Sequence, residues 1–210
     1  IRNYASLLES KGYKIIKVPV NDEGLLQLDI LKKSISEQTA LVSIQHANSE
    51  TSVIQDVAEI SAICRNLWTL LHSDCVQTFC KIDVDATFFD AISISAHKVY
   101  GPKGVGAVYI NDNIEFKPLI PSTKQEKGLR AGTENVAGIA SFATAAKLLY
   151  AERSDEFIRI TDFKQSIIER LKSKNIDFKV EGSNKLSLPH ILGLRFKGIE
   201  GQYLMLECSQ

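Results

Sequence analysis

One lysine of this sequence occupies a position at which an amine could do covalent chemistry. Lys98 follows the β-rich run at residues 91–94 and precedes a glycine-rich stretch at residues 101–106. A lysine that is partly dehydrated at a sheet end, near other positive charge, has a lowered pKa and can form an imine with an aldehyde. The alternative is an exposed loop lysine, which is the commoner situation for this residue type.

Asp74 and Gln77 provide a carboxylate and an amide near the end of a second apolar run. Asp74 ends the run at residues 68–74, where an aspartate can cap a helix over residues 75–79. The same carboxylate could balance the charge of a protonated ring nitrogen on a bound ligand. The two roles exclude each other only if the side chain turns toward its own backbone. Gln77 could bind the same ligand through its amide.

Ser95 and His97 flank Lys98 with a hydroxyl and an imidazole. The glycines at residues 101–106 lack the lysine followed by serine or threonine of a P-loop, so we interpret them as shaping the backbone. Arg130 to Thr133, with the sequence RAGT, add further donors. Together these groups are suited to binding a phosphate.

Strand and helix patterns alternate in the first half of the chain. We expect strands within residues 39–47, 68–74 and 88–96, and a helix over residues 56–67. Nearly continuous apolar strands separated by helices predict an α/β fold with a mostly parallel sheet between helices. Ligands in such sheets bind beyond the carboxyl ends of the strands. Polar residues at 45–50, 72–74 and 95–98 are therefore expected to line one crevice.

Further elements are expected toward the two ends of the sequence. They are an initial helix that ends near Gly12, a strand over residues 13–18, helices over residues 134–153 and 155–173, strands within residues 176–182 and 189–197, and a helix from about Gly201. The order helix, strand, strand, helix is typical of an α+β module. We therefore predict two domains, residues 1–150 and 151–210.

The composition excludes several classes of partner. Lysine plus arginine equals aspartate plus glutamate at 25 each, so the broad attraction that nucleic acids or anionic membranes require is missing. A run of about 18 apolar residues, long enough to span a bilayer, does not occur either. We expect a cytosolic protein that binds neither nucleic acid nor membrane.

The four cysteines do not indicate a metal site. They are Cys64, Cys75, Cys80 and Cys208, and none forms the Cys-x-x-Cys spacing of zinc or redox centres. Each is expected to behave as a small buried hydrophobic residue, with Cys208 packed inside the second domain.

Four ordered blocks resemble those of one enzyme family. SAHKVYGPKGVGAVYI, at residues 95–110, resembles the cofactor-lysine signature of the class V aminotransferases. HANSETSVIQ, HSDCVQTFCKIDVD and RAGTENVAGIA resemble three further blocks of the NifS-like cysteine desulfurase branch. The resemblance covers essentially the whole chain. It implies the fold type I of pyridoxal-phosphate (PLP) transferases, with part of the large domain in residues 1–150 and part of the small domain in residues 151–210.

The resemblance also implies residue roles around the PLP ring. Lys98 matches the lysine that holds PLP as a Schiff base and later moves protons. Asp74 matches the partner of the pyridine nitrogen, and Gln77 matches the residue that binds the phenolic oxygen. Asn48 lies in the block that faces the ring and the substrate, although Ser49 stands where the family usually has a second asparagine.

Three residues match ligands of the PLP phosphate. Ser95 and His97 match ligands within the subunit, and Thr133 matches a ligand supplied by the neighbouring subunit. The resemblance therefore also implies a homodimer.

The implied activity is conversion of L-cysteine to L-alanine, with the sulfur leaving as a persulfide on a separate cysteine for a sulfur-acceptor or iron–sulfur scaffold protein. That cysteine is expected beyond Gln210, so we interpret the sequence as the middle portion of such an enzyme. Two alternatives stay open at this point. One is another class V enzyme, such as a selenocysteine lyase or an aminotransferase. The other is a non-catalytic protein that keeps the fold as a dimeric scaffold.

Overall fold

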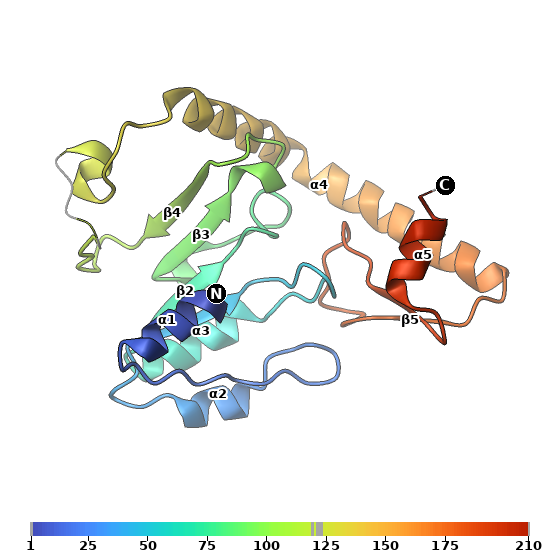
Figure 1. Cartoon of the computed structure of the whole chain (residues 1–210), viewed down its shortest axis with the longest axis horizontal. Helices are drawn as coiled ribbons and strands as arrows, with labels where there is room; N and C mark the ends of the chain where they lie inside the picture. Colours follow the sequence, from blue (N-terminus) through green and yellow to red (C-terminus); the bar gives the residue numbers. More distant parts are fainter. Residues whose placement is uncertain (1, 119, 121–123, 210) are drawn as a thin grey trace.

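The computed structural model describes residues 2–118, 120 and 124–209. The α-helices are α1 (Arg2–Ser10), α2 (Leu28–Ser34), α3 (Val57–Asn66), α4 (Val136–Ser173) and α5 (Gly201–Glu207). The strands are β1 (Leu41–Gln45), β2 (Leu70–Asp74), β3 (Ala91–Ser95), β4 (Gly106–Ile110), β5 (Phe178–Val180) and β6 (Leu194–Phe196). Short 3₁₀ turns are η1 (Ala86–Phe88), η2 (Ala96–Lys98) and η3 (Gln125–Gly128). Figure 1 shows their arrangement.

Strands β1 to β4 form one sheet in sequence order. β1, β2 and β3 are parallel, and β4 runs antiparallel to β3 at the edge. The long crossovers between parallel strands carry α3 after β1 and η1 after β2. The predicted α/β class with a mostly parallel sheet is therefore confirmed.

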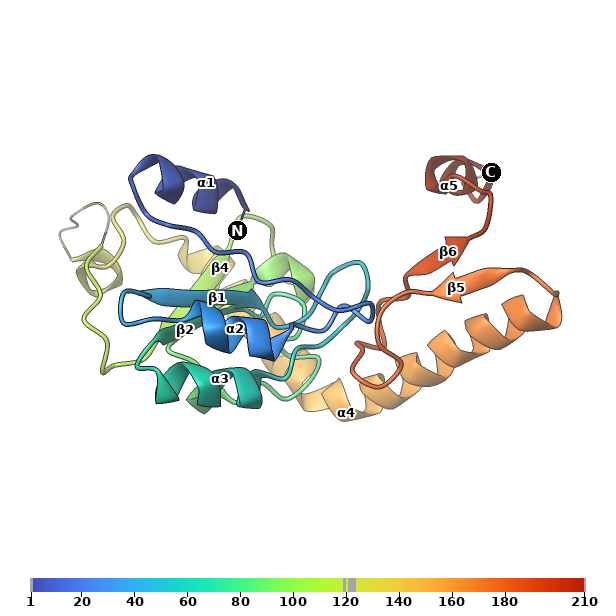
Figure 2. The ribbon, with the colours of Figure 1, turned by 90° about the horizontal axis from the view of Figure 1, so that it is seen from below.

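One face of the sheet packs on α2 and α3 (Figure 2). The core on this face is formed mainly by Leu31, Val42, Ile60, Cys64, Leu71, Phe89 and Ile92. Asp56 fixes the start of α3, because its side chain accepts a hydrogen bond from the Glu59 backbone N–H at 3.0 Å. Helix α1 lies on the other side of the sheet (Figure 2).

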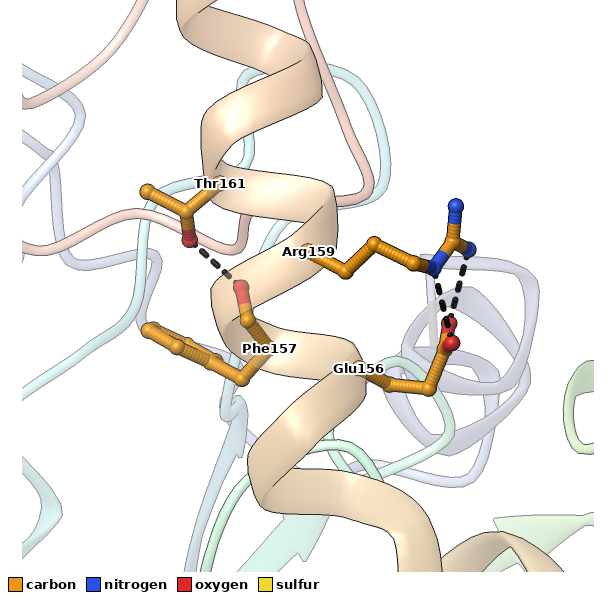
Figure 3. Close-up of polar contacts among 4 residues, drawn as sticks. All are labelled: Glu156, Phe157, Arg159 and Thr161. Atoms are coloured by element: carbon orange, nitrogen blue, oxygen red, sulfur yellow. Dashed lines mark hydrogen bonds and ion pairs between the residues drawn. The ribbon is translucent and has the colours of Figure 1, made fainter.

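Helix α4 continues without a break for 38 residues, so the prediction of two helices here was wrong. The stretch around Ser154 contains neither glycine nor proline, so nothing in the backbone stops the helix. Arg159 pairs with Glu156 at 2.8 Å on its exposed surface, and Thr161 donates to the Phe157 carbonyl (Figure 3). No described helix, α4 included, has a stretch long and apolar enough to cross a bilayer.

The strand predicted over residues 13–18 does not form. Its β-branched and aromatic residues favour extended backbone, but a strand also needs a hydrogen-bonded neighbour. Residues 13–18 have no bridge partner in the described structure, and the isolated bridge between Val20 and Leu26 lies just after them.

The predicted order of helix, strand, strand, helix is found in the last third of the chain. β5 and β6 form an antiparallel pair beside the C-terminal half of α4, and α5 follows (Figures 1 and 2). Residues 183–188 return to the first part of the chain, where the Leu188 N–H donates to the Ser52 carbonyl at 2.9 Å. Helix α4 runs through residue 150 and so belongs to both predicted domains. The domain boundary at residue 150 stays a prediction.

Candidate active site

The carboxyl ends of β1, β2 and β3 meet at one edge of the sheet. Asp74, the last residue of β2, pairs with Gln45 of β1 and with Ser93 of β3. Paired residues in a sheet point to the same face, and residues two apart along a strand do so as well. Asp74, Ser93 and Ser95 therefore share one face, opposite the α2–α3 core. The polar strand ends therefore lie at one edge of the sheet, and that they line one crevice stays a prediction.

Asp74 turns one oxygen toward its own backbone. Its Oδ1 atom accepts a hydrogen bond from the Val76 N–H at 3.1 Å, and the residue is half-buried. The following residues form a turn and not the predicted helix. The turn is closed by the Thr78 and Phe79 N–H groups, which donate to the Cys75 carbonyl at 3.0 and 2.9 Å. This turn carries Gln77, which is half-buried.

Ser95 and His97 contact each other at the end of β3. The Ser95 Oγ atom lies 2.8 Å from His97 Nδ1. Ser95 is half-buried and His97 is exposed. This contact uses one proton, so with a neutral ring the pair offers an anion one donor, which is either the Ser95 hydroxyl or Nε2–H of His97, depending on the tautomer.

Lys98 ends η2 and is exposed, so the expectation of a partly dehydrated amine was wrong for the chain as it stands. Its positive charge nevertheless lies near other cations. Burial first, and then the charge of Lys98, lower the pKa of Lys81 to about 8. Lys81 Nζ itself lies 3.4 Å from Nε2 of His190.

The glycine-rich stretch holds the backbone beneath Lys98. The Gly101 N–H donates to the Ala96 carbonyl at 2.9 Å, and the Ala96 N–H donates to the Val105 carbonyl at 3.0 Å. A Cβ atom on Gly101 would lie 3.0 Å from the Ala96 Cβ and carbonyl oxygen. One on Gly106 would lie 2.8 Å from the Ile94 carbonyl oxygen. Glycine is needed at both positions because the chain passes too closely for a side chain.

Asn48 lies in the loop after β1, and Thr133 lies in the loop before α4. Asn48 is half-buried, and its Oδ1 atom accepts from the Glu50 and Thr51 N–H groups at 2.9 Å each. Thr133 is exposed in the loop before α4, two residues ahead of the N-cap Asn135. The roles of Asn48 and Thr133 toward a ligand stay predictions.

Two histidines, His72 in β2 and His46 directly after β1, make polar contacts that were not predicted. His72 bridges three strands, since its Nδ1 lies 2.8 Å from Ser43 Oγ and its Nε2 lies 2.9 Å from Ser93 Oγ. Buried His46 lies with Nδ1 3.0 Å from Thr78 Oγ1. The sequence showed histidines next to the predicted strand ends, but their partners depend on the strand register, which cannot be read from the sequence.

The cysteines follow the prediction in three of four cases. Cys64, Cys75 and Cys80 are buried, and burial raises the pKa of each thiol. Cys208 is exposed, so the prediction that it packs inside the second domain was wrong. α5 has no buried residue, and the turn that follows it leaves Cys208 in solvent. Among the described residues, no group of histidine, cysteine, aspartate and glutamate could hold a metal.

The family model described as aminotransferase class-V matches residues 2–210.

The chain belongs to the class V aminotransferase family.

Similar proteins include a NifS protein of Bacillus subtilis (strain 168), named as a cysteine desulfurase, which is 43% identical over 100% of this chain and 54% of its own length. A solved NifS-like protein has a TM-score of 0.93 and 36% identity, over 99% of this chain and 57% of that chain. A solved structure of SspA in complex with cysteine has a TM-score of 0.80 and 29% identity, over 99% and 57% of the two chains. The chain thus spans about half the length of these class V relatives.

The donor set at the sheet edge fits PLP. The contact with the Val76 N–H engages only Oδ1 of Asp74, so Oδ2 can partner a pyridinium nitrogen and the two predicted roles of this carboxylate do not exclude each other. An amine at Lys98 can bond an aldehyde. The Ser95 hydroxyl and His97 imidazole lie together as a phosphate site requires. The close backbone turn at Gly101 keeps these groups on one short segment.

Proposed function

We propose that the protein acts as a PLP-dependent cysteine desulfurase. It converts L-cysteine to L-alanine and transfers the sulfur as an enzyme persulfide for iron–sulfur cluster or thio-cofactor assembly. The observation that carries the proposal is the shared sheet edge, where Asp74 ends β2, Ser95 ends β3 on the same face, and η2 with His97 and Lys98 follows directly. Relatives named as cysteine desulfurases support this reaction over the other class V activities.

The predicted site residues have separate tasks in this proposal. Lys98 bonds PLP and moves the proton between substrate and product, while Asp74 holds the ring nitrogen in its protonated form. Gln77 donates to the phenolic oxygen, and Asn48 faces the ring and the substrate. When bound, PLP supplies the electron sink that stabilises negative charge at the substrate α-carbon.

The phosphate would be held by three residues. Ser95 and His97 act as a pair, and Thr133 acts on the phosphate of the neighbouring subunit. The proposal therefore includes a homodimer. It also includes a cytoplasmic location and transfer of sulfur to an acceptor or scaffold protein, in keeping with the balanced charge of the chain. L-cysteine as substrate is supported by a related structure in complex with cysteine.

A pair of lysine variants tests the site in the full-length protein. The wild type is expected to be yellow, with an absorption band at about 420 nm from bound PLP. Lys98→Ala should lose the band and the label fixed by borohydride reduction. Lys103→Ala, an exposed lysine in the same turn, should keep both. Label that persists in Lys98→Ala would show that another group holds PLP.

The products identify the reaction. With L-cysteine, alanine and reducible sulfur should form in equal amounts, and a thiol acceptor should speed turnover. Alanine formation only from selenocysteine would favour a lyase, and a requirement for an oxo acid would favour an aminotransferase. A colourless but stable dimer would favour the scaffold reading.

A further inference from the structure

His46 is a buried histidine to which the proposed reaction gives no task. It directly follows β1, is 4% exposed and lies edge-on to Phe89, with ring centroids 6.0 Å apart. Its Nδ1 atom lies 3.0 Å from Thr78 Oγ1 and 3.8 Å from Cys75 Sγ. Both of these neighbours are fully buried. The ring therefore touches the turn that follows Asp74.

Thr78 and His46 are joined by one hydrogen bond between two buried groups. The Thr78 hydroxyl lies 3.2 Å from the Cys75 carbonyl and 3.0 Å from His46 Nδ1, and its one proton can go to either acceptor. When the proton goes to the carbonyl, Nδ1–H of His46 donates to the hydroxyl; when it goes to Nδ1, the ring carries its own proton on Nε2. Burial lowers the pKa of His46 to about 4, which keeps the ring neutral near pH 7. In either tautomer the neutral ring holds Thr78 by one hydrogen bond.

A nucleophilic pair of Cys75 and His46 does not fit these contacts. Cys75 is fully buried, and burial raises the pKa of its thiol, so the reactive thiolate is disfavoured. Neither the sulfur nor the ring is open to a substrate.

The turn held by His46 carries the groups that face the cofactor. Its first residue, Cys75, donates its N–H to the Ser93 carbonyl at 3.0 Å, and the Val76 N–H binds the Asp74 carboxylate. Gln77 lies immediately before Thr78 in this turn. A shift of Thr78 would therefore move Gln77 directly and Asp74 through Val76.

We infer that His46 is a positioning residue, which sets the Asp74–Gln77 turn against the cofactor ring through its hydrogen bond to Thr78. The inference rests on the proposed function. The His46 backbone N–H also donates to the Asp74 carbonyl at 2.9 Å. That bond survives a side-chain substitution, so the effect of the imidazole can be measured separately.

Two substitutions of His46 in the full-length holoenzyme test the role. His46→Asn places an amide, which can donate or accept a hydrogen bond, where Nδ1 lies, and His46→Leu fills the space without a polar atom. Loss of one buried hydrogen bond corresponds to about tenfold in an equilibrium constant. We expect His46→Leu to bind PLP about tenfold more weakly and to shift the absorption maximum and its pH dependence. His46→Asn should stay within about twofold of the wild type.

Thr78→Val approaches the same contact from the other side and is useful if His46→Leu does not fold. It should reproduce the weaker PLP binding, whereas Thr161→Val, which removes an exposed helical hydroxyl, should not. The double variant His46→Leu/Thr78→Val should bind PLP no more weakly than either single variant. Additive losses, or equal losses for His46→Asn and His46→Leu, would overturn the inference.

The wild type separates this inference from the proposed function. If the wild type binds no PLP, the proposed function fails, and the role of His46 toward PLP fails with it. If the wild type binds PLP and all His46 variants bind it equally well, the inference alone is overturned.

Discussion

Ser95 and His97 contact each other directly, with Ser95 Oγ 2.8 Å from His97 Nδ1. The hydroxyl thereby fixes the ring and leaves Nε2 for a ligand. Ser95→Ala is expected to weaken PLP binding about three- to tenfold, because the hydroxyl that orients the His97 ring, or that itself donates to the phosphate in the other tautomer, is lost. The dissociation constant from absorbance titration measures the change.

The control for Ser95→Ala is Ser166→Ala. Ser166 is exposed on α4, where its hydroxyl donates to the Asp162 carbonyl. This variant should bind PLP as the wild type does. Equal affinity of Ser95→Ala and the wild type would count against the phosphate assignment.

Lys81→Met is expected to raise the pKa of His190. That pKa is lowered to about 4 by burial first and then by the charges of Lys81, Lys164 and Lys98. Removing the nearest of these charges should move the pKa up, although burial keeps it below its ordinary value. An NMR titration of the ring follows the change. Lys11→Met, at an exposed lysine directly after α1 that does not act on the pKa of His190, should leave that pKa unchanged. An unchanged pKa in Lys81→Met would show that the two side chains are apart in solution.

Gly101→Ala is expected to destabilise the turn that carries Lys98. The added Cβ would lie 3.0 Å from both the Cβ and the carbonyl oxygen of Ala96. Overpacking of this kind lowers the free energy of unfolding by about 1–3 kcal/mol. Denaturant titration measures it. Gly201→Ala is the matched control, since its Cβ would meet nothing within 4 Å. A Gly101→Ala protein as stable as this control would mean that the turn can open at little cost.

The unfolding free energy should fall as the pH is lowered from about 6.5 to about 4, in part because of His46. Burial lowers its pKa from 6.5 to about 4 in the folded chain. In this window the unfolded chain binds the proton and the folded chain does not, so acid favours unfolding. The difference between the two values corresponds to an upper limit of about 3 kcal/mol.

Burial also lowers the pKa values of His72 and His190, and both contribute in the same direction. The comparison of interest is therefore between the wild type and His46→Asn, which cannot titrate at this position. The variant should lose less stability than the wild type over the same pH range. Parallel stability curves would indicate that the His46 ring is hydrated.

Several features of the fold followed from the sequence because they depend on local patterns. Apolar runs ended by polar residues at Asp74 and Ser95 predicted parallel strands with their carboxyl ends at one edge, and this was found. Four ordered blocks around Lys98 indicated the family, which the match over residues 2–210 confirms. The helix from Gly201 was also placed correctly.

Other features depended on what surrounds a segment. Residues 13–18 have the composition of a strand, but no neighbouring strand pairs with them in the described structure. The Asp155 region resembles a helix start, yet α4 passes through it because nothing there interrupts the backbone hydrogen bonds. Exposure of Lys98 and Cys208 could not be predicted, because it depends on which other elements cover them.

By itself the sequence determined the family and the α/β class and predicted the residues that would hold PLP, since these are carried by residue types at short spacing. Only the tertiary structure decided which residues that are far apart in the sequence contact each other. Lys81 and His190 are 109 positions apart, and His46 and Thr78 are 32 apart. Strand register and the return of residues 183–188 bring these pairs within hydrogen-bonding distance. Contacts of that kind come from the packing of whole elements, which no short stretch of sequence encodes.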